Sequence, residues 1–335
     1  LCLSLLLTGA SARAEDRAGR ISELKNKSML MANTKRFKEA IALSEQALKL
    51  DKDDATIYFL RARIREEQKD PVAALKELNK AIELNPKYAE AYLMRARAFY
   101  FLAEMDEGTD NTLRARNDLE MALKLNPRLA GAYDYKGVGL ASDNKLKEAL
   151  VCFSKAVELD KTNIGFLNHR AMVLNAMGKK MEATADLRRA AEIEKNNPHA
   201  WMTLSQQLAD VGIYQEAVTS INKAIVLKPN RLDNIYKRAL LYQKLHMYKE
   251  ALADLNKVLE SSPSDDDALR MRGDAYLGLK DFPRALKDYD QAIKLSGAQA
   301  SHYQARAKLH RLMGKNAAAS KDESTAAKLK AEKPK

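Results

Sequence analysis

Small and large apolar positions recur along this chain with a fixed period, which equals the separation of Ala40 from Ala74. If the first period begins at residue 21, position 20 of every period is alanine, and one longer step, from Ala74 to Ala115, interrupts the series. The nine alanines are Ala40, Ala74, Ala115, Ala149, Ala183, Ala217, Ala251, Ala285 and Ala319. A fixed period of this length indicates one small unit repeated, so the chain is predicted to be an array of such units.

Other positions of the period also keep one type of residue from unit to unit. Position 8 is Ala, Ser or Gly in every unit, position 27 is Ala in all units except one that has Val258, and position 4 is large and apolar. Small residues let two helices approach closely, and large ones fill the gaps. Glycines at position 15 and prolines near position 32 mark the ends of a first and a second helix. The pattern predicts an all-α array of helix-turn-helix hairpins.

The same positions resemble the tetratricopeptide repeat, which has W, L, G, Y, A, F, A and P at positions 4, 7, 8, 11, 20, 24, 27 and 32. The segments AWMTLSQQLADVGIYQEAVTSINKAIVLKPN (200–230) and AYLMRARAFY (91–100) carry this pattern. The resemblance implies a right-handed α-solenoid over residues 21–333, a tail at 334–335, and a concave groove that binds proteins or peptides. The nine repeats start at residues 21, 55, 89, 130, 164, 198, 232, 266 and 300.

The longer step, from Ala74 to Ala115, places seven extra residues within 101–113 of the third repeat. Seven residues are about two helical turns, so both helices of this hairpin could lengthen by about one turn. Gly108 and Asp110 would then form the connecting turn. A surface insertion without a role and a contact site for a partner are the two interpretations.

Position 7 departs from the leucine of the family. It is Arg in six units, and position 23 is acidic in the same six units, whereas the other units have Leu43, Cys152 or Ser220 there. We therefore expect the Arg of each first helix to pair with the carboxylate of the second helix in its hairpin; a basic ladder that contacts a ligand is the alternative. The predicted pairs are Arg61 with Glu77, Arg95 with Asp118, Arg170 with Asp186, Arg238 with Asp254, Arg272 with Asp288 and Arg306 with Asp322.

In the resembling family, positions 2, 5, 9, 12 and 13 of the first helix form most of the concave surface. At these positions repeats 2 and 3 have aromatic and arginine side chains, which are common anchors of protein interfaces, and repeats 4 to 6 have amides and methionines. A merely solvated inner face is the alternative interpretation. The candidate groove residues are Phe59, Arg63, Leu93, Arg97, Tyr100, Phe101, Asp134, Asn168, Met172, Asn175 and Gln206.

The first residues, LCLSLLLTGASARA (1–14), are apolar and end in small residues, with Ala12 and Ala14 placed as the A-x-A of a signal peptidase site. They lack an initial Met and a basic start, so we interpret them as a truncated signal peptide, followed by a short linker at 15–20. This interpretation predicts export to the periplasm or the exterior, with a retained anchor as the alternative.

Charge adds one feature. The chain has a formal net charge of +12, and nine Lys or Arg face three acids within residues 299–335. Such a basic end could contact an anionic membrane surface. A soluble cap with a frayed tail explains the same residues.

The sequence lacks motifs typical of catalysis or metal binding. The five histidines show no metal-binding spacing, His302 and His310 are expected to lack a nearby carboxylate, and no phosphate loop or nucleophile motif occurs. The sequence therefore predicts a non-enzymatic, exported scaffold for a protein or peptide, without cofactor or metal, and argues against nucleic acid. Two alternatives stay open: an envelope-assembly or membrane-surface adaptor that uses the basic C-terminal repeat, and an accessory subunit of an envelope enzyme.

Overall fold

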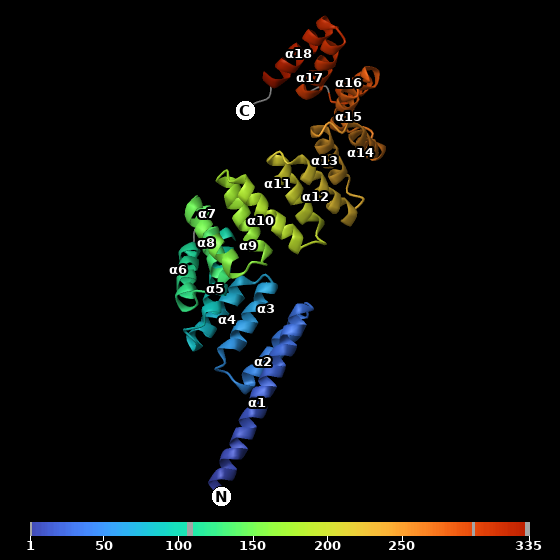
Figure 1. The fold of residues 1–335 in the computed structure, drawn as a ribbon. Coiled ribbons are helices and arrows are strands. Elements are labelled where there is room, and N and C mark those ends of the chain that lie inside the picture. Colours follow the sequence, from blue (N-terminus) through green and yellow to red (C-terminus); the bar gives the residue numbers. More distant parts are fainter. Residues whose placement is uncertain (1, 106–109, 297–298, 332–335) are drawn as a thin grey trace. The chain divides into compact units, whose positions relative to one another are not determined.

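The computed structural model describes residues 2–105, 110–296 and 299–331, with residues 2–14 as backbone only. Within this part of the chain, eighteen α-helices follow one another (Figure 1). They are α1 (Cys2–Asn33), α2 (Phe37–Leu50), α3 (Ala55–Glu67), α4 (Pro71–Leu84), α5 (Ala89–Met105), α6 (Asn111–Leu125), α7 (Ala130–Ser142), α8 (Leu146–Leu159), α9 (Ile164–Ala176), α10 (Lys180–Ile193), α11 (Pro198–Asp210), α12 (Tyr214–Leu227), α13 (Leu232–Lys244), α14 (Tyr248–Ser261), α15 (Asp266–Gly278), α16 (Phe282–Leu295), α17 (Ala300–Leu312) and α18 (Asn316–Ala331).

The helices belong to two compact units, residues 1–177 and 178–335. In the first unit α3 packs on α4 and α4 on α5, and in the second α11 packs on α12 and α12 on α13. Each unit is therefore a stack in which a hairpin contacts mainly the hairpins next to it. This architecture confirms the predicted all-α array of helix-turn-helix hairpins.

Helix boundaries follow the period of the sequence. The helices α4, α6, α12 and α14 each end two residues before a proline, which cannot continue a helix. The odd-numbered helices α3 to α17 begin where the repeats were predicted to begin, at residues 55, 89, 130, 164, 198, 232, 266 and 300.

The first helix departs from the expected linker. Residues 15–20, predicted to connect a signal peptide to the first repeat, lie inside α1. The physical reason is that this stretch holds no proline and only one glycine, Gly19, so nothing strong stops the helix. Its side chains are exposed, and the core begins only with Leu24, which packs on Ala47 and Ile57. No described helix is long and apolar enough to cross a membrane.

In every repeat except the third, which holds the insertion, position 15 adopts one backbone conformation. Gly178, Gly212 and Gly314 have φ between 73° and 81°, as their place at the end of a first helix predicts. Lys280 and four other residues at position 15 also have positive φ, near 60°. The turn geometry therefore comes from hairpin packing, which imposes the left-handed conformation even on residues that do not favour it.

Small positions form the seam of each hairpin. All nine alanines at position 20 are buried, and at position 8 the hydroxyls of Ser28 and Ser205 donate to the carbonyls of Ala40 and Ala217 at 2.7 and 2.8 Å. Close contact between the two helices leaves no space for larger side chains here.

Glycine occupies position 8 only where position 24 is aromatic. A Cβ added to Gly137 would lie 2.8 Å from the ring of Phe153, and one added to Gly273 would lie 2.6 Å from the ring of Tyr289. Both rings are fully buried. The missing methyl group at position 8 therefore makes the space that the ring at position 24 fills.

The insertion of the third repeat extends one helix. α5 has 17 residues where α3 has 13, whereas α6 has 15 where α4 has 14. The extra turn expected in both helices is thus present only in the first. Gly108 lies outside the described residues, and Asp110 directly precedes α6.

Candidate binding groove

Arginine at position 7 holds together the two helices of a hairpin. Arg238 on α13 donates from Nε and Nη2 to the two carboxylate oxygens of Asp254 on α14, at 2.8 and 2.7 Å. The same two-pronged contact joins Arg95 to Asp118, Arg272 to Asp288 and Arg306 to Asp322. Arg61 donates to a single oxygen of Glu77. Arg170 and Asp186 lie in different units, so their pairing stays a prediction.

The third guanidinium nitrogen reaches the preceding hairpin, a contact that sequence reasoning missed. Nη1 of Arg238 donates to Asn222 at 2.8 Å, and Nη1 of Arg306 donates to Asp290 at 2.7 Å. These partners occupy position 25 of the repeat before the arginine, as do Asn79 and Asn256. One guanidinium thus ties three helices together, and an Asn or Asp at position 25 of the preceding repeat is the sequence signal for this contact.

The inner face is hollowed at three places. In the first unit, a first hollow of about 190 Å³ lies among α1, α3 and α5, and a second of about 330 Å³ lies among α3, α4, α5 and α7. These two adjoin, because Glu66, Met94 and Arg97 line both. A third hollow of about 260 Å³ in the second unit includes Met202 and Lys237.

Five candidate groove residues remain accessible on this face of the first unit. Arg63 is exposed and lines the first hollow. Arg97 lies between the two hollows, and Phe101, 43% exposed, lines the second. Asn168 and Met172 are exposed on α9. The exposed atoms of these side chains can therefore reach a partner.

Other candidates are used for packing inside the first unit. Phe59 stacks on Tyr88 with ring centroids 4.8 Å apart. Leu93 packs close to Gly131 on the next hairpin, where an added Cβ would lie 3.2 Å from Cδ2 of Leu93. The array itself therefore occupies part of the predicted contact surface.

Tyr100, Asn175 and Gln206 complete the candidates. Tyr100 lines the second hollow. Its hydroxyl is buried, and a Cβ added to Gly139 would lie 2.5 Å from that hydroxyl. Asn175 is half-buried. Gln206 lies in the second unit, where it lines the third hollow and bonds Asp210 at 2.9 Å.

Models of the tetratricopeptide repeat match residues 33–98, 211–275 and 266–298. Together with the first helices that begin at eight of the nine predicted repeat starts, these matches identify the family. The chain is a tetratricopeptide-repeat protein. Its family architecture is typical of scaffolds for protein–protein interaction.

Solved structures with similar folds include other tetratricopeptide-repeat proteins. YrrB, described as having an unusual peptide-binding site, is 23% identical, with a TM-score of 0.49, over 56% of this chain and 97% of its own. MamA from Desulfovibrio magneticus RS-1 is 24% identical, with a TM-score of 0.46, over 51% and 97%. Yeast Tom70 is 17% identical, with a TM-score of 0.38, over 93% and 85%. No curated protein sequence matches significantly.

An ion pair separates the two hollows of this tetratricopeptide-repeat protein. Nη2 of Arg97 lies 2.9 Å from the carboxylate of Glu66, and its guanidinium lies over the ring of Tyr135 at 5.5 Å. Burial raises the pKa of Glu66, and the nearby positive charge of Arg97 opposes that rise. The pair therefore neutralises both charges at the boundary between the hollows.

Residues that sequence reasoning missed also line the second hollow of the tetratricopeptide-repeat array. Met94 and Tyr135 occupy position 6, which the family pattern does not place in the groove. Lys69 and Asp70 come from the turn between α3 and α4, and Glu104 comes from the extra turn of α5. For Glu104 the signal was its spacing, three residues after Phe101 on the same helix.

Asp134, a predicted groove residue, is instead buried against the next repeat. Its carboxylate lies 2.8 Å from Nδ1 of His169, and the imidazole also packs on the ring of Phe153 with centroids 5.7 Å apart. The hydrogen bond to Asp134 raises the pKa of His169, and burial opposes this effect. Because His169 is a neighbour from another hairpin, position 5 alone did not reveal this pairing.

This pair predicts a pH dependence of stability. Since the folded-state pKa of His169 is raised, its contribution is fully present below the unfolded pKa of about 6.5 and is lost as the pH rises through the folded-state value. The thermal unfolding midpoint of wild type relative to His169→Gln should therefore fall as the pH is raised above about 6.5. Asp134→Asn should remove the same dependence, and parallel curves for wild type and both variants would contradict the assignment.

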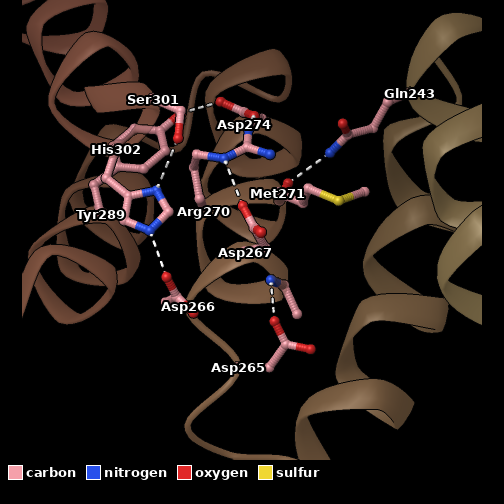
Figure 2. Close-up of polar contacts among 11 residues, drawn as sticks. Gln243, Asp265, Asp266, Asp267, Arg270, Met271, Asp274, Tyr289, Ser301 and His302 are labelled. Carbon is pink, nitrogen blue, oxygen red and sulfur yellow. Dashed lines mark hydrogen bonds and ion pairs between the residues drawn. The ribbon is translucent and has the colours of Figure 1, made fainter. Parts of the chain in front are cut away.

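A second polar cluster joins the last two repeats of the tetratricopeptide-repeat array (Figure 2). His302 is fully buried, and its Nε2 lies 2.8 Å from the carboxylate of Asp266, which corrects the expectation that it has no carboxylate nearby. The hydroxyl of Tyr289 donates to Asp274 at 2.7 Å, and Arg270 contacts the other oxygen of Asp274. Burial raises the pKa of Asp274. These contacts tie α15, α16 and α17 together.

Among the described residues, no three His, Cys, Asp or Glu side chains are grouped as a metal site. Cys152 is half-buried and forms no disulfide with any side chain that the structure describes, and burial raises the pKa of its thiol. The His169–Asp134 and His302–Asp266 pairs thus connect helices to one another.

Proposed function

We propose that this tetratricopeptide-repeat protein is a non-enzymatic scaffold that holds a segment of a partner protein along the inner face of its first unit. The observation that carries the proposal is the pair of adjoining hollows across the first three repeats. Arg63 and Phe101, side-chain types that anchor many protein interfaces, are accessible there. The pairs of Arg61 with Glu77 and of Arg95 with Asp118 hold in place the helices that carry these two side chains.

The apolar start of the chain supports a further part of the proposal, that the scaffold is exported. Cleavage after Ala14 would leave the core unchanged, because residues 15–20 are exposed and the residues packed on the core begin with Ile21. Sequencing of the protein's mature N-terminus should then find Glu15 first. An unchanged start would contradict cleavage.

The binding proposal is tested by affinity purification from a cell extract, with captured proteins identified by mass spectrometry. The double variant Arg63→Ala/Phe101→Ala should reduce recovery of the specific partner about tenfold or more, since such anchors carry most of the binding energy of an interface. Tyr100 is left unchanged because it packs on Gly139.

The matched control is Val151→Ala, which alters a side chain that is 70% exposed on α8 of the same unit but lines neither hollow. This variant should capture the partner as the wild type does, and thermal unfolding should show both variants folded. Equal recovery by the double variant and the wild type would remove the inner face of the first unit as the binding site.

A further inference from the structure

The second hollow owes one edge to a feature that no other repeat has. The extra turn of α5 extends past Phe101 and brings Glu104 to the hollow. Met94, Phe101 and Tyr135 form apolar walls, and the volume of about 330 Å³ is at the lower end for a ligand pocket. The cavity is therefore suited to one large side chain rather than to a whole small molecule.

The edge of this hollow has an excess of negative charge. Glu66 is neutralised by Arg97, which leaves Asp70 and Glu104 against Lys69. Glu104 is exposed and has no hydrogen bond or ion pair within the described residues. In a chain with a formal net charge of +12, this local excess is opposite to the overall charge. It favours a positively charged group at the mouth of the cavity.

Exposed apolar side chains extend the same surface. Phe101 and Met105 are 43% and 72% exposed and lie four residues apart on α5, so they share a face of that helix with Glu104 between them in sequence. A partner that covered this face would bury apolar area and meet the carboxylate of Glu104 at once.

We propose that the second hollow receives a large apolar side chain of the partner segment, with a Lys or Arg next to it in the segment paired to Glu104 and Asp70. The insertion in the third repeat is then a specificity element. This inference rests on the proposed function, because it names the class of segment that the inner face selects. An acidic segment, drawn to Arg63 in the first hollow, is the competing outcome.

The test uses the full chain and short random peptides displayed on phage, followed by fluorescence anisotropy with labelled synthetic peptides. Selected peptides should contain Trp, Phe or Leu beside Lys or Arg. Replacing the apolar residue by Ser should weaken binding about tenfold, and replacing the basic residue by Glu about threefold to tenfold.

Two variants assign this preference to the second hollow. Glu104→Lys should weaken binding of the apolar–basic peptide and strengthen binding of its Glu-containing counterpart, whereas Phe101→Ser should weaken both. Glu120→Lys is the matched control, because Glu120 is an exposed acid in the same hairpin that does not line the hollow. It should bind like the wild type, and thermal unfolding should verify that all three are folded.

The outcomes separate the two proposals. Peptides that bind but are insensitive to Glu104→Lys and Phe101→Ser, or that are selected for acidic residues, would overturn the inference and leave the scaffold proposal standing. If no peptide binds and Arg63→Ala/Phe101→Ala captures partners like the wild type, both proposals fail. A preference for apolar–basic peptides that reverses in Glu104→Lys supports the inference.

Discussion

Replacing Arg238 by Met should lower the free energy of unfolding by about 3 kcal/mol, because the variant leaves a buried carboxylate without its partner. Asp254 is 3% exposed and receives both of its hydrogen bonds from this guanidinium. The variant also removes the donor to Asn222 on the preceding hairpin. Urea and thermal unfolding followed by circular dichroism measure the loss.

The double variant Arg238→Met/Asp254→Leu should recover much of this stability, because it removes the unpaired charge together with the cost of burying it. Arg188→Met is the control. Arg188 also bridges two helices of the second unit, to Glu216 at 2.9 Å, but both side chains are about half exposed. Its loss should cost less than about 1 kcal/mol. Equal unfolding midpoints for wild type and Arg238→Met would show that the clamp contributes nothing to stability.

Gly137→Ala should destabilise the first unit by about 1–3 kcal/mol through overpacking. The added methyl group would lie 2.8 Å from the ring of Phe153, which is fully buried, so the ring or the helix must shift. Gly19→Ala is the matched control. Nothing lies within 4 Å of its added Cβ on the exposed part of α1, so the gain in helix propensity should stabilise by about 0.5–1 kcal/mol.

Adding Phe153→Leu to Gly137→Ala should cost less than the sum of the two single changes. The double variant has the Ala and Leu that repeats 2, 3, 5 and 7 carry at positions 8 and 24. A coupling energy of about 0.5–3 kcal/mol in the double-mutant cycle would measure this compensation. Strict additivity would mean that the two positions do not constrain each other.

The sequence predicted the residues packed between the two helices of a hairpin better than it predicted the residues of the groove. Ala217, Gly212 and the pair of Arg238 with Asp254 could be found because each belongs to a rule that recurs along the chain. Asp134 could not be placed correctly, because its partner His169 is contributed once, by the following repeat. Contacts between hairpins depend on which residues two different repeats happen to present, and a periodic pattern carries no information on such pairs.

The second hollow, too, depends on contacts between hairpins that the periodic pattern could not predict. The longer step from Ala74 to Ala115 predicted an added turn in the first helix of the third repeat, but not that this turn brings Glu104 to a cavity beside Phe101. That result depends on the turn of the preceding hairpin, with Lys69 and Asp70, lying opposite the added helical turn.

Local periodicity was sufficient for the hairpin, for the starts of repeats 2 to 9 and for five of the six pairings of position 7 with position 23, and the resemblance of the same positions to the tetratricopeptide repeat indicated the family. These features follow from steric and charge constraints that every repeat must meet. Which candidate groove residues stay accessible, where the inner face is hollowed and how its charges are neutralised became evident only from the packed helices. The physical reason is that burial and charge pairing at a surface are set by neighbours distant in sequence, each of which occurs only once.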